Sequence, residues 1–189
     1  MAPSPDKARL VESWVEEYGD QLYRYALLRV RNGPAAEDLV QEAFVAALKS
    51  ADSFRGDSSA RTWLTGILKH KIMDYFRDLA KSASDGTGPD DSGSFGGAFD
   101  ETRHWKVPPK AWPRTPDKEA DLSALREALG KCLDGLPERQ RRIFILRETD
   151  GIDTGELCKV FGLTPTNLWV ILHRIRHQLK NCLERNWIG

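Results

Sequence analysis

The sequence has few cysteines, no long apolar run and no net charge, and each shortage narrows what the chain can be. Its 189 residues include three cysteines, Cys132, Cys158 and Cys182. An odd number of widely spaced cysteines fits reduced thiols better than a disulfide framework. No stretch approaches the apolar length that spans a bilayer, and the short polar N-terminus does not resemble a signal peptide, so we expect a cytoplasmic protein.

Motifs for catalysis and metal binding are also missing. The sequence contains no phosphate-binding loop, nucleophile elbow or metalloprotease motif, so we expect no enzyme. The three cysteines together with His104 or His177 could in principle ligate zinc, but no pair has the close spacing of a zinc knuckle. We therefore expect no cofactor and no metal, and a thiol- or zinc-responsive regulator remains one alternative function.

The charges balance over the whole chain but not along it. There are 28 basic and 28 acidic side chains. Residues 1–53 and 82–121 carry an acidic excess, whereas residues 54–81 and 122–189 carry a basic one. This alternation indicates anionic and cationic partners at different places on the protein.

Helical periodicity is what the sequence has in abundance. Residues 10–80 read as helical almost throughout, and helices resume near Asp121. No segment alternates like a strand. We therefore predict an all-α fold of two small helical domains, residues 1–81 and 121–189, joined by a long linker over residues 82–120.

The helix predicted from Pro34 to about Ala51 has two different faces. Asn32 and Gly33 interrupt the chain before it, and Pro34 suits a first helical position. One face is an apolar stripe of Val40, Phe44, Ala47, Leu48 and Ala51. Another face carries Asp38, Gln41, Glu42 and Val45. On spacing alone, a solvated acidic face is the favoured interpretation.

Residues 153–180 have the pattern of a helix-turn-helix. Asp153 or Thr154 can cap a short helix, Gly162 suits a tight turn, and Thr164 can cap a longer helix. The longer helix has an apolar face of Leu168, Ile171, Leu172, Ile175 and Leu179. Its opposite side offers groups that suit phosphates and base edges in a DNA major groove. An ordinary helical hairpin with a solvated basic face is the alternative.

The linker is not uniform. Residues 82–93 have the composition of a flexible spacer. The following proline-rich stretch carries aromatic rings and a histidine: Phe95, Phe99, His104, Trp105 and Trp112. Exposed aromatics reduce the solubility of a pure spacer, so we expect this part to dock, either on the chain's own domains or on a partner.

Several motifs together resemble those of a known family. Four segments of the first domain resemble region two of a bacterial sigma factor. They are Asp38-Leu39-Val40-Gln41-Glu42-Ala43-Phe44, Phe54-Arg55-Gly56-Asp57, Thr62-Trp63-Leu64 and Asp74-Tyr75-Phe76-Arg77. Two segments of the second domain resemble region four: Cys132-Leu133-Asp134-Gly135-Leu136-Pro137 and the helix-turn-helix. A chain with only these two regions is similar to the extracytoplasmic-function (ECF) subfamily of the sigma-70 family. The resemblance covers roughly residues 10–80 and 122–186.

The resemblance implies a function and its partners. The chain would bind core RNA polymerase, through the β′ clamp and the β subunit, and direct promoter-specific initiation at −10 and −35 elements. Its linker would run through the polymerase near the RNA exit path, where an acidic balance fits mimicry of nucleic acid. An anti-sigma factor would hold the free protein inactive.

The resemblance also implies which residues make each contact. Polymerase would be bound by Asp38, Gln41, Glu42 and Phe44, with Phe44 equally suited to the core. The −10 element would be read and melted by Arg61, Trp63, Lys69, His70, Lys71, Tyr75 and Arg77. The −35 element would be bound by Thr166, Asn167, Trp169, Val170, His173, Arg174 and Arg176.

Three of these positions have a qualification. His70 stands where many members have asparagine, and Trp169 where arginine is common, so the bases that they read can differ from the family's usual ones. For Trp63, core packing is the favoured interpretation over DNA stacking.

A helix-turn-helix regulator that acts without polymerase is the remaining alternative. Such a regulator needs neither an acidic helix nor a basic aromatic helix in its first domain, and it often carries a ligand-binding domain instead. The first domain therefore discriminates between the two functions.

Overall fold

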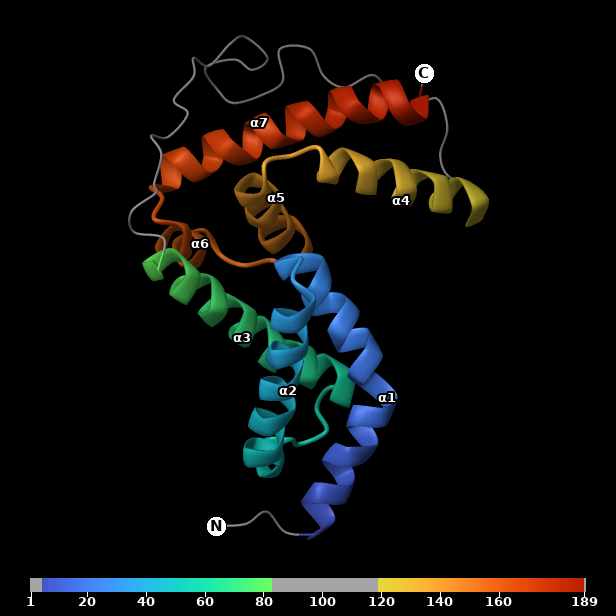
Figure 1. Ribbon diagram of the computed structural model, residues 1–189, viewed down its shortest axis with the longest axis vertical. Helices are drawn as coiled ribbons and strands as arrows, with labels where there is room; N and C mark the ends of the chain where they lie inside the picture. Colours follow the sequence, from blue (N-terminus) through green and yellow to red (C-terminus); the bar gives the residue numbers. More distant parts are fainter. Residues whose placement is uncertain (1–4, 83–118, 189) are drawn as a thin grey trace. The chain divides into compact units, whose positions relative to one another are not determined.

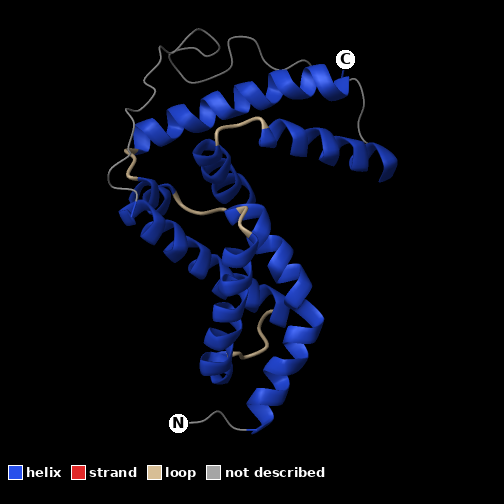
Figure 2. Cartoon of the chain, in the orientation of Figure 1, coloured by secondary structure: helices blue, strands red, loops and turns tan. Residues whose placement is uncertain are grey.

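The computed structural model describes residues 5–82 and 119–188, and within those ranges its regular structure is helical, with no strand (Figures 1 and 2). The predicted all-α fold is confirmed. The described helices form two compact units, one built from α1–α3 and the other from α4, α5, α7 and the greater part of α6. The predicted aromatic linker lies outside the described residues, and the domain boundaries stay predictions.

The first unit contains α1 (Pro5–Val30), α2 (Gly33–Ser50), a short 3-10 turn (Ala51–Ser53) and α3 (Ala60–Ser82). The turn between α1 and α2 is tight because Arg31 adopts a left-handed conformation with φ of 51°. Each pair of the three helices is in contact. Their shared core contains Trp14, Leu22, Ala26, Leu39, Val40, Ala43, Phe44, Leu64, Leu68, Ile72, Met73 and Phe76.

The second unit contains α4 (Glu119–Asp134), α5 (Glu138–Phe144), a π-helical turn (Ile145–Thr149), α6 (Thr154–Phe161), α7 (Pro165–Leu183) and a second π-helical turn (Glu184–Ile188). The helix of α5 thus widens into the π-helical turn that follows it, where Ile145 and Leu146 are buried. The core here contains Ile143, Leu146, Leu157, Leu168, Leu172, Ile175 and Leu179.

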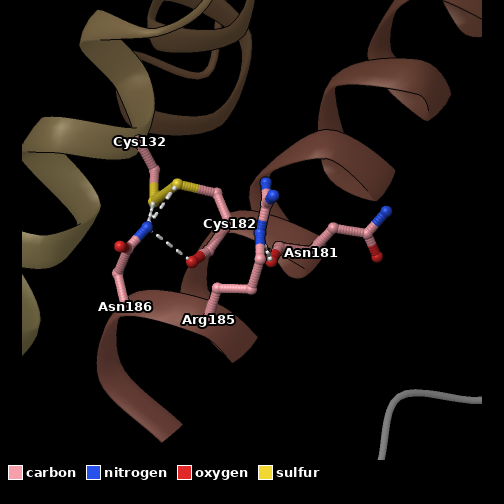
Figure 3. Close-up of a disulfide and its surroundings, with 5 residues drawn as sticks. All are labelled: Cys132, Asn181, Cys182, Arg185 and Asn186. Carbon is pink, nitrogen blue, oxygen red and sulfur yellow. Dashed lines mark hydrogen bonds between the residues drawn. A yellow bond between two sulfur atoms is a disulfide. The ribbon is translucent and has the colours of Figure 1, made fainter. Parts of the chain in front are cut away.

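The cysteines contradict the expectation of reduced thiols. Cys132 in α4 and Cys182 near the end of α7 form a disulfide, with their Cα atoms 5.8 Å apart (Figure 3). The pair is separated by 50 positions in the sequence, so only the packing of α4 against α7 reveals it. Cys158 is a free, half-buried cysteine.

Candidate partner and nucleic-acid interfaces

The outward face of α2 is the first candidate surface. The side-chain oxygen of Asn32 accepts a hydrogen bond from the Ala35 N–H at 3.0 Å and caps the helix, directly after the chain interruption that the sequence indicated. Exposed side chains then recur at helical spacing opposite the core: Asp38, Gln41, Glu42 and Val45. Val45 is 52% exposed, so an apolar side chain sits among two carboxylates and an amide.

Phe44 does not belong to this outward face. Its side chain is only 8% exposed and lies in the core with Val40 and Ala47. Phe44 follows Val40 by four residues, so the same helical rhythm that exposes Glu42 turns Phe44 inward. This burial favours the core alternative for Phe44, and its contact with polymerase stays a prediction.

An ion pair connects the acidic face of α2 to α3. The Lys71 ammonium donates to the Glu42 carboxylate at 3.0 Å. Such a partly exposed pair contributes roughly 0–1 kcal/mol to stability. The pair matters more for where Lys71 points. The sequence predicted that Lys71 contacts DNA, but its side chain is directed at Glu42, which is predicted to contact polymerase.

The outward face of α3 is the second candidate surface. The Ser59 hydroxyl accepts from the Thr62 N–H at 3.2 Å and caps the helix start. Trp63, His70 and Arg77 follow one another at intervals of about two turns, so they share one side of α3. Arg77 forms an ion pair on this side with Asp74. His70 and Arg61 are exposed.

The other predicted −10 residues are spread around α3. Lys69 and Lys71 are two positions apart, so their side chains leave the helix in different directions. Tyr75 is half-buried, and its ring lies 5.5 Å from that of Phe76. A single strand following one side of α3 would therefore not meet all seven predicted residues.

Trp63 belongs to an aromatic cluster. Its ring centroid lies 5.3 Å from that of Phe54 and 5.7 Å from that of Trp14. Trp14 and Phe54 are themselves 5.2 Å apart in an edge-on arrangement. Aromatic contacts of this kind stabilise a core beyond their area burial. The favoured interpretation of Trp63 as a packing residue agrees with this geometry, although its side chain is only half-buried.

The outward face of α7 is the third candidate surface. The Thr164 hydroxyl accepts from the Asn167 N–H at 3.2 Å, Pro165 occupies the first turn, and Gly162 before them has φ of 62°. The start of α7 is therefore fixed by the residues that the sequence indicated. With Leu168, Leu172 and Ile175 buried, the opposite side of the helix carries Thr166, Val170 and His173. Thr166 is exposed there, and the other two are half-buried.

Residues on the two edges of this outward face differ in exposure. Asn167 and Arg174 lie on one edge and are half-buried. Trp169 and Arg176 lie on the other, and Trp169 is 43% exposed. An indole with that exposure on a helix of this kind can reach a thymine methyl group or a sugar.

Arg176 is the predicted −35 residue whose surroundings differ most from the prediction. Its guanidinium donates to the Glu148 carboxylate at 2.6 Å. Arg176 also follows Leu172 by one turn, which brings it close to the core side of α7. These contacts favour a role in holding α7 to the preceding π-helical turn.

His173 is an uncharged hydrogen-bonding group at neutral pH. Burial lowers the pKa of its imidazole below the ordinary value, and the nearby Arg176 and His177 lower it further. A neutral imidazole can accept and donate hydrogen bonds to base edges but does not neutralise phosphate.

Two family models match the chain in the order of the two predicted domains. "Sigma-70 region 2" matches residues 14–82, which include α2 and α3. "Sigma-70, region 4" matches residues 126–179, which include α6 and most of α7. The chain belongs to the sigma-70 family.

Relatives of the sigma factor agree with this assignment over most of its length. It is 35% identical over 174 residues to a Haemophilus influenzae protein named "Probable RNA polymerase sigma factor", a match that covers 90% of this chain and 88% of the relative. It is 28% identical to the Escherichia coli protein named "ECF RNA polymerase sigma-E factor", over 86% of this chain and 82% of the relative. The chain is an ECF-type sigma factor that binds RNA polymerase and directs transcription initiation at promoters.

One solved structure is also similar. It contains the sigma factor RpoE with the anti-sigma factor NepR from Bartonella quintana, at 22% identity and a TM-score of 0.43 over 92% of this chain and 96% of that chain. A likeness of that size adds nothing to the assignment.

The family assignment decides between the alternatives left open by the sequence. A regulator acting without polymerase is not favoured, because the region-two match covers the whole acidic helix and the basic aromatic helix. No cluster of three potential metal-ligating side chains exists within residues 5–82 and 119–188. Among the same described residues, no helix is long and apolar enough to cross a membrane.

Besides the disulfide, sequence reasoning missed two ion pairs of the sigma factor. The Glu42–Lys71 and Glu148–Arg176 pairs each join side chains nearly thirty positions apart. An excess of opposite charge on neighbouring helices was visible, but helical periodicity alone does not give the register between helices. These pairs matter because they occupy three residues of the predicted interfaces.

Proposed function

We propose that this sigma factor docks on the coiled coil of the polymerase β′ clamp through the outward face of α2, defined by Asp38, Gln41, Glu42 and Val45. The β subunit then holds other parts of the chain. In this arrangement α3 reads and opens the −10 element, and α7 binds the −35 element as duplex.

The observation that carries the proposal is the composition of the outward face of α2. Asp38, Gln41 and Glu42 are exposed around Val45, while the opposite side of the helix is fully used by the core. Carboxylates beside an exposed aliphatic group are complementary to a basic helical hairpin. The ion pair with Lys71 positions Glu42 on this face in the free protein.

At the −10 element, the proposal assigns different tasks to different sides of α3. Opened bases need stacking surfaces and hydrogen-bonding groups, while their backbone needs cations. His70 is exposed and central on the outward side, so it is the residue that meets an unstacked base. Arg61 and Lys69 supply positive charge along the strand, and Tyr75 supplies a ring.

At the −35 element, α7 enters the major groove. Thr166, Val170 and His173 face the base edges, with Asn167 and Arg174 on one edge of that face and Trp169 on the other. Asn167 suits adenine and Arg174 suits guanine or phosphate. Arg176 contributes mainly by holding α7 in place through Glu148.

The test of polymerase docking is a charge reversal on α2. We expect Asp38→Lys to weaken binding to purified core polymerase by about tenfold, equivalent to about 1.4 kcal/mol, because it opposes a basic partner surface. Glu42→Gln should weaken binding less, since it removes one charge without reversing it. Binding is measured by fluorescence titration of labelled full-length protein.

The matched control is Glu12→Lys, an exposed acid on α1 changed in the same way. It should bind core polymerase like the wild type. Binding of duplex −35 DNA should be unchanged in all three variants. If Asp38→Lys and Glu12→Lys weaken core binding equally, the effect is one of net charge and the proposed docking face is wrong.

An anti-sigma factor is the remaining proposed partner. Its support is the exposed apolar side chains of the first unit, Leu10, Val15, Leu28, Val45 and Leu79, which a partner could cover. Selection for constitutive promoter activity should yield loss-of-function mutations in a gene whose product binds the purified sigma factor. If all such mutations lie in the sigma factor gene itself, this partner is excluded.

A further inference from the structure

Two cysteines of the second unit, called the region-four unit below, lie away from the residues proposed to contact promoter DNA. Cys132 comes from the last turns of α4 and Cys182 from the last turn of α7, and their sulfurs are bonded (Figure 3). The proposed DNA-contacting residues occupy the first half of α7. Neither cysteine therefore has a role in the −35 contacts proposed above.

A disulfide at this place is unusual for a transcription factor. RNA polymerase works in a compartment whose glutathione and thioredoxin systems keep thiols reduced, and disulfides found there are commonly transient or redox-sensing. A cysteine pair that folding brings to a Cα separation of 5.8 Å can close without rearrangement of the helices. Both the dithiol and the disulfide are therefore compatible with the same fold.

The two sulfurs differ in their access to solvent. Cys132 is 4% exposed and packs with Leu136, Ile175 and Leu179. Cys182 is half-buried and lies at the edge of that cluster. A small oxidant in water therefore reaches Cys182 first, and Cys132 is placed to attack from inside.

Asn186 supplies a polar group beside the pair. Its side-chain amide nitrogen lies 2.9 Å from the Cys182 carbonyl oxygen, 3.2 Å from the Cys182 sulfur and 4.0 Å from the Cys132 sulfur (Figure 3). The contact with the carbonyl holds the amide in place. An N–H aimed at the Cys182 sulfur favours its thiolate, which is the form that reacts.

We propose that Cys132 and Cys182 are a site of reversible oxidation by peroxides. The Cys182 thiolate attacks the peroxide O–O bond and becomes a sulfenic acid, and one water leaves. The Cys132 thiol then attacks that sulfur, the S–S bond forms and the second water leaves. Two thiols and one hydrogen peroxide thus give one disulfide and two waters, and a cellular dithiol reverses the reaction by exchange.

Oxidation at this site stabilises the region-four unit. The bond ties α4 to the far end of α7 and closes a segment that contains α5, α6 and nearly all of α7. Closing a segment of 50 residues restricts the unfolded chain strongly. In the dithiol form, the apolar cluster around Cys132 still packs the same two helix ends together, without the covalent bond.

Cys158 offers a matched control within the same unit. It is a free cysteine, and burial raises the pKa of its thiol, as does the nearby Asp153. A raised pKa leaves less thiolate at neutral pH and makes Cys158 a poor nucleophile. Cys158→Ser should therefore leave the oxidation unchanged.

The experiment uses the full-length protein, fully reduced and then treated with hydrogen peroxide at about equimolar amounts. We expect two of three thiols to be lost and peptide mass spectrometry to identify a Cys132–Cys182 link. The Tm of the region-four transition should rise by at least about 10 °C. Dithiothreitol should reverse both changes.

Variants separate this site from other oxidations. Cys182→Ser changes a half-buried side chain and should abolish both the link and the Tm rise, as should Cys132→Ser. Cys158→Ser should behave like the wild type. The proposal is overturned if peroxide links Cys158 instead, or if the Tm is the same in both redox states.

Glutathione buffers distinguish a switch from a permanent bond. Equilibrated with mixtures ranging from almost fully reduced to mostly oxidised glutathione, the protein should pass from dithiol to disulfide within that range. A pair that stays oxidised in the most reducing mixture is a fixed structural bond, and that result also contradicts the proposal.

Discussion

At the scale of single residues, two arginines on α7 have different surroundings. Arg174 lies on the edge of the outward face, whereas Arg176 donates to Glu148 at 2.6 Å. We expect Arg174→Ala to weaken binding of duplex −35 DNA by about 5- to 100-fold, because a contact to phosphate or guanine contributes about 1–3 kcal/mol. Fluorescence anisotropy with the full-length chain measures this.

Arg176→Ala is the matched control for that measurement. It removes the same charge from the same helix but breaks an internal, partly exposed ion pair, so affinity should fall by no more than about fivefold. Equal losses for the two variants would mean that both arginines contact DNA and that the sequence prediction for Arg176 holds.

His173 gives a residue-scale prediction about pH. Burial lowers its pKa in the folded protein, together with Arg176 and His177. Between that lowered pKa and the ordinary value near 6.5, the unfolded chain binds a proton that the folded one does not, so stability falls as pH decreases below about 6.5. His173→Gln should reduce the drop in region-four Tm between pH 7.5 and 5.5, measured by calorimetry.

The control for His173 is His70→Gln, which changes an exposed histidine of the other unit. Its pH dependence of the region-four Tm should match that of the wild type. An undiminished drop in His173→Gln would show that other groups cause the acid sensitivity.

At the scale of elements, the start of α7 depends on one side chain. The Thr164 hydroxyl accepts from the Asn167 N–H, so Thr164→Ala should lower the free energy of unfolding of this unit by about 1 kcal/mol. Thr166 and Asn167, which are proposed to contact DNA, follow the cap directly, so affinity for −35 DNA should fall as well. Denaturant titration and anisotropy measure the two effects.

Thr164→Ser keeps the capping oxygen and should retain both stability and affinity. If Thr164→Ser loses as much as Thr164→Ala, the effect comes from the lost methyl group rather than from the cap.

The caps also explain how far elements could be predicted from the sequence. Asp153 and Thr164 cap helices where the sequence indicated caps, because capping depends on neighbours two or three residues away. Phe44 was left open because it stands next to the boundary between two faces of α2. Helical spacing alone does not say how wide the buried side is.

Contacts between elements were the part that the sequence did not reveal. The disulfide of Cys132 with Cys182 depends on how α4 packs against α7, and the pairing of Glu42 with Lys71 depends on the register of α2 against α3. Both are tertiary facts, and a single sequence contains no separate signal for them. The odd number of cysteines led to the wrong prediction of reduced thiols, because two of the three form the disulfide and the third is free.

At the scale of the whole molecule, the two helical units are proposed to perform different steps of initiation. In the proposed mechanism, α2 docks on polymerase, α3 reads the bases at −10, and α7 binds the −35 duplex. Because these surfaces lie on different elements, their variants should fail at different steps. Asp38→Lys should lose core binding while Arg174→Ala keeps it.

Run-off transcription tests this division most directly. Core polymerase is combined with the full-length sigma factor on genomic fragments from its host, and transcripts are mapped. The account predicts discrete promoter-specific transcripts with the wild type, their loss with Asp38→Lys because polymerase is not bound, and a reduction with Arg174→Ala despite normal core binding. Tight core binding by the wild type without any promoter-specific transcript would contradict the account.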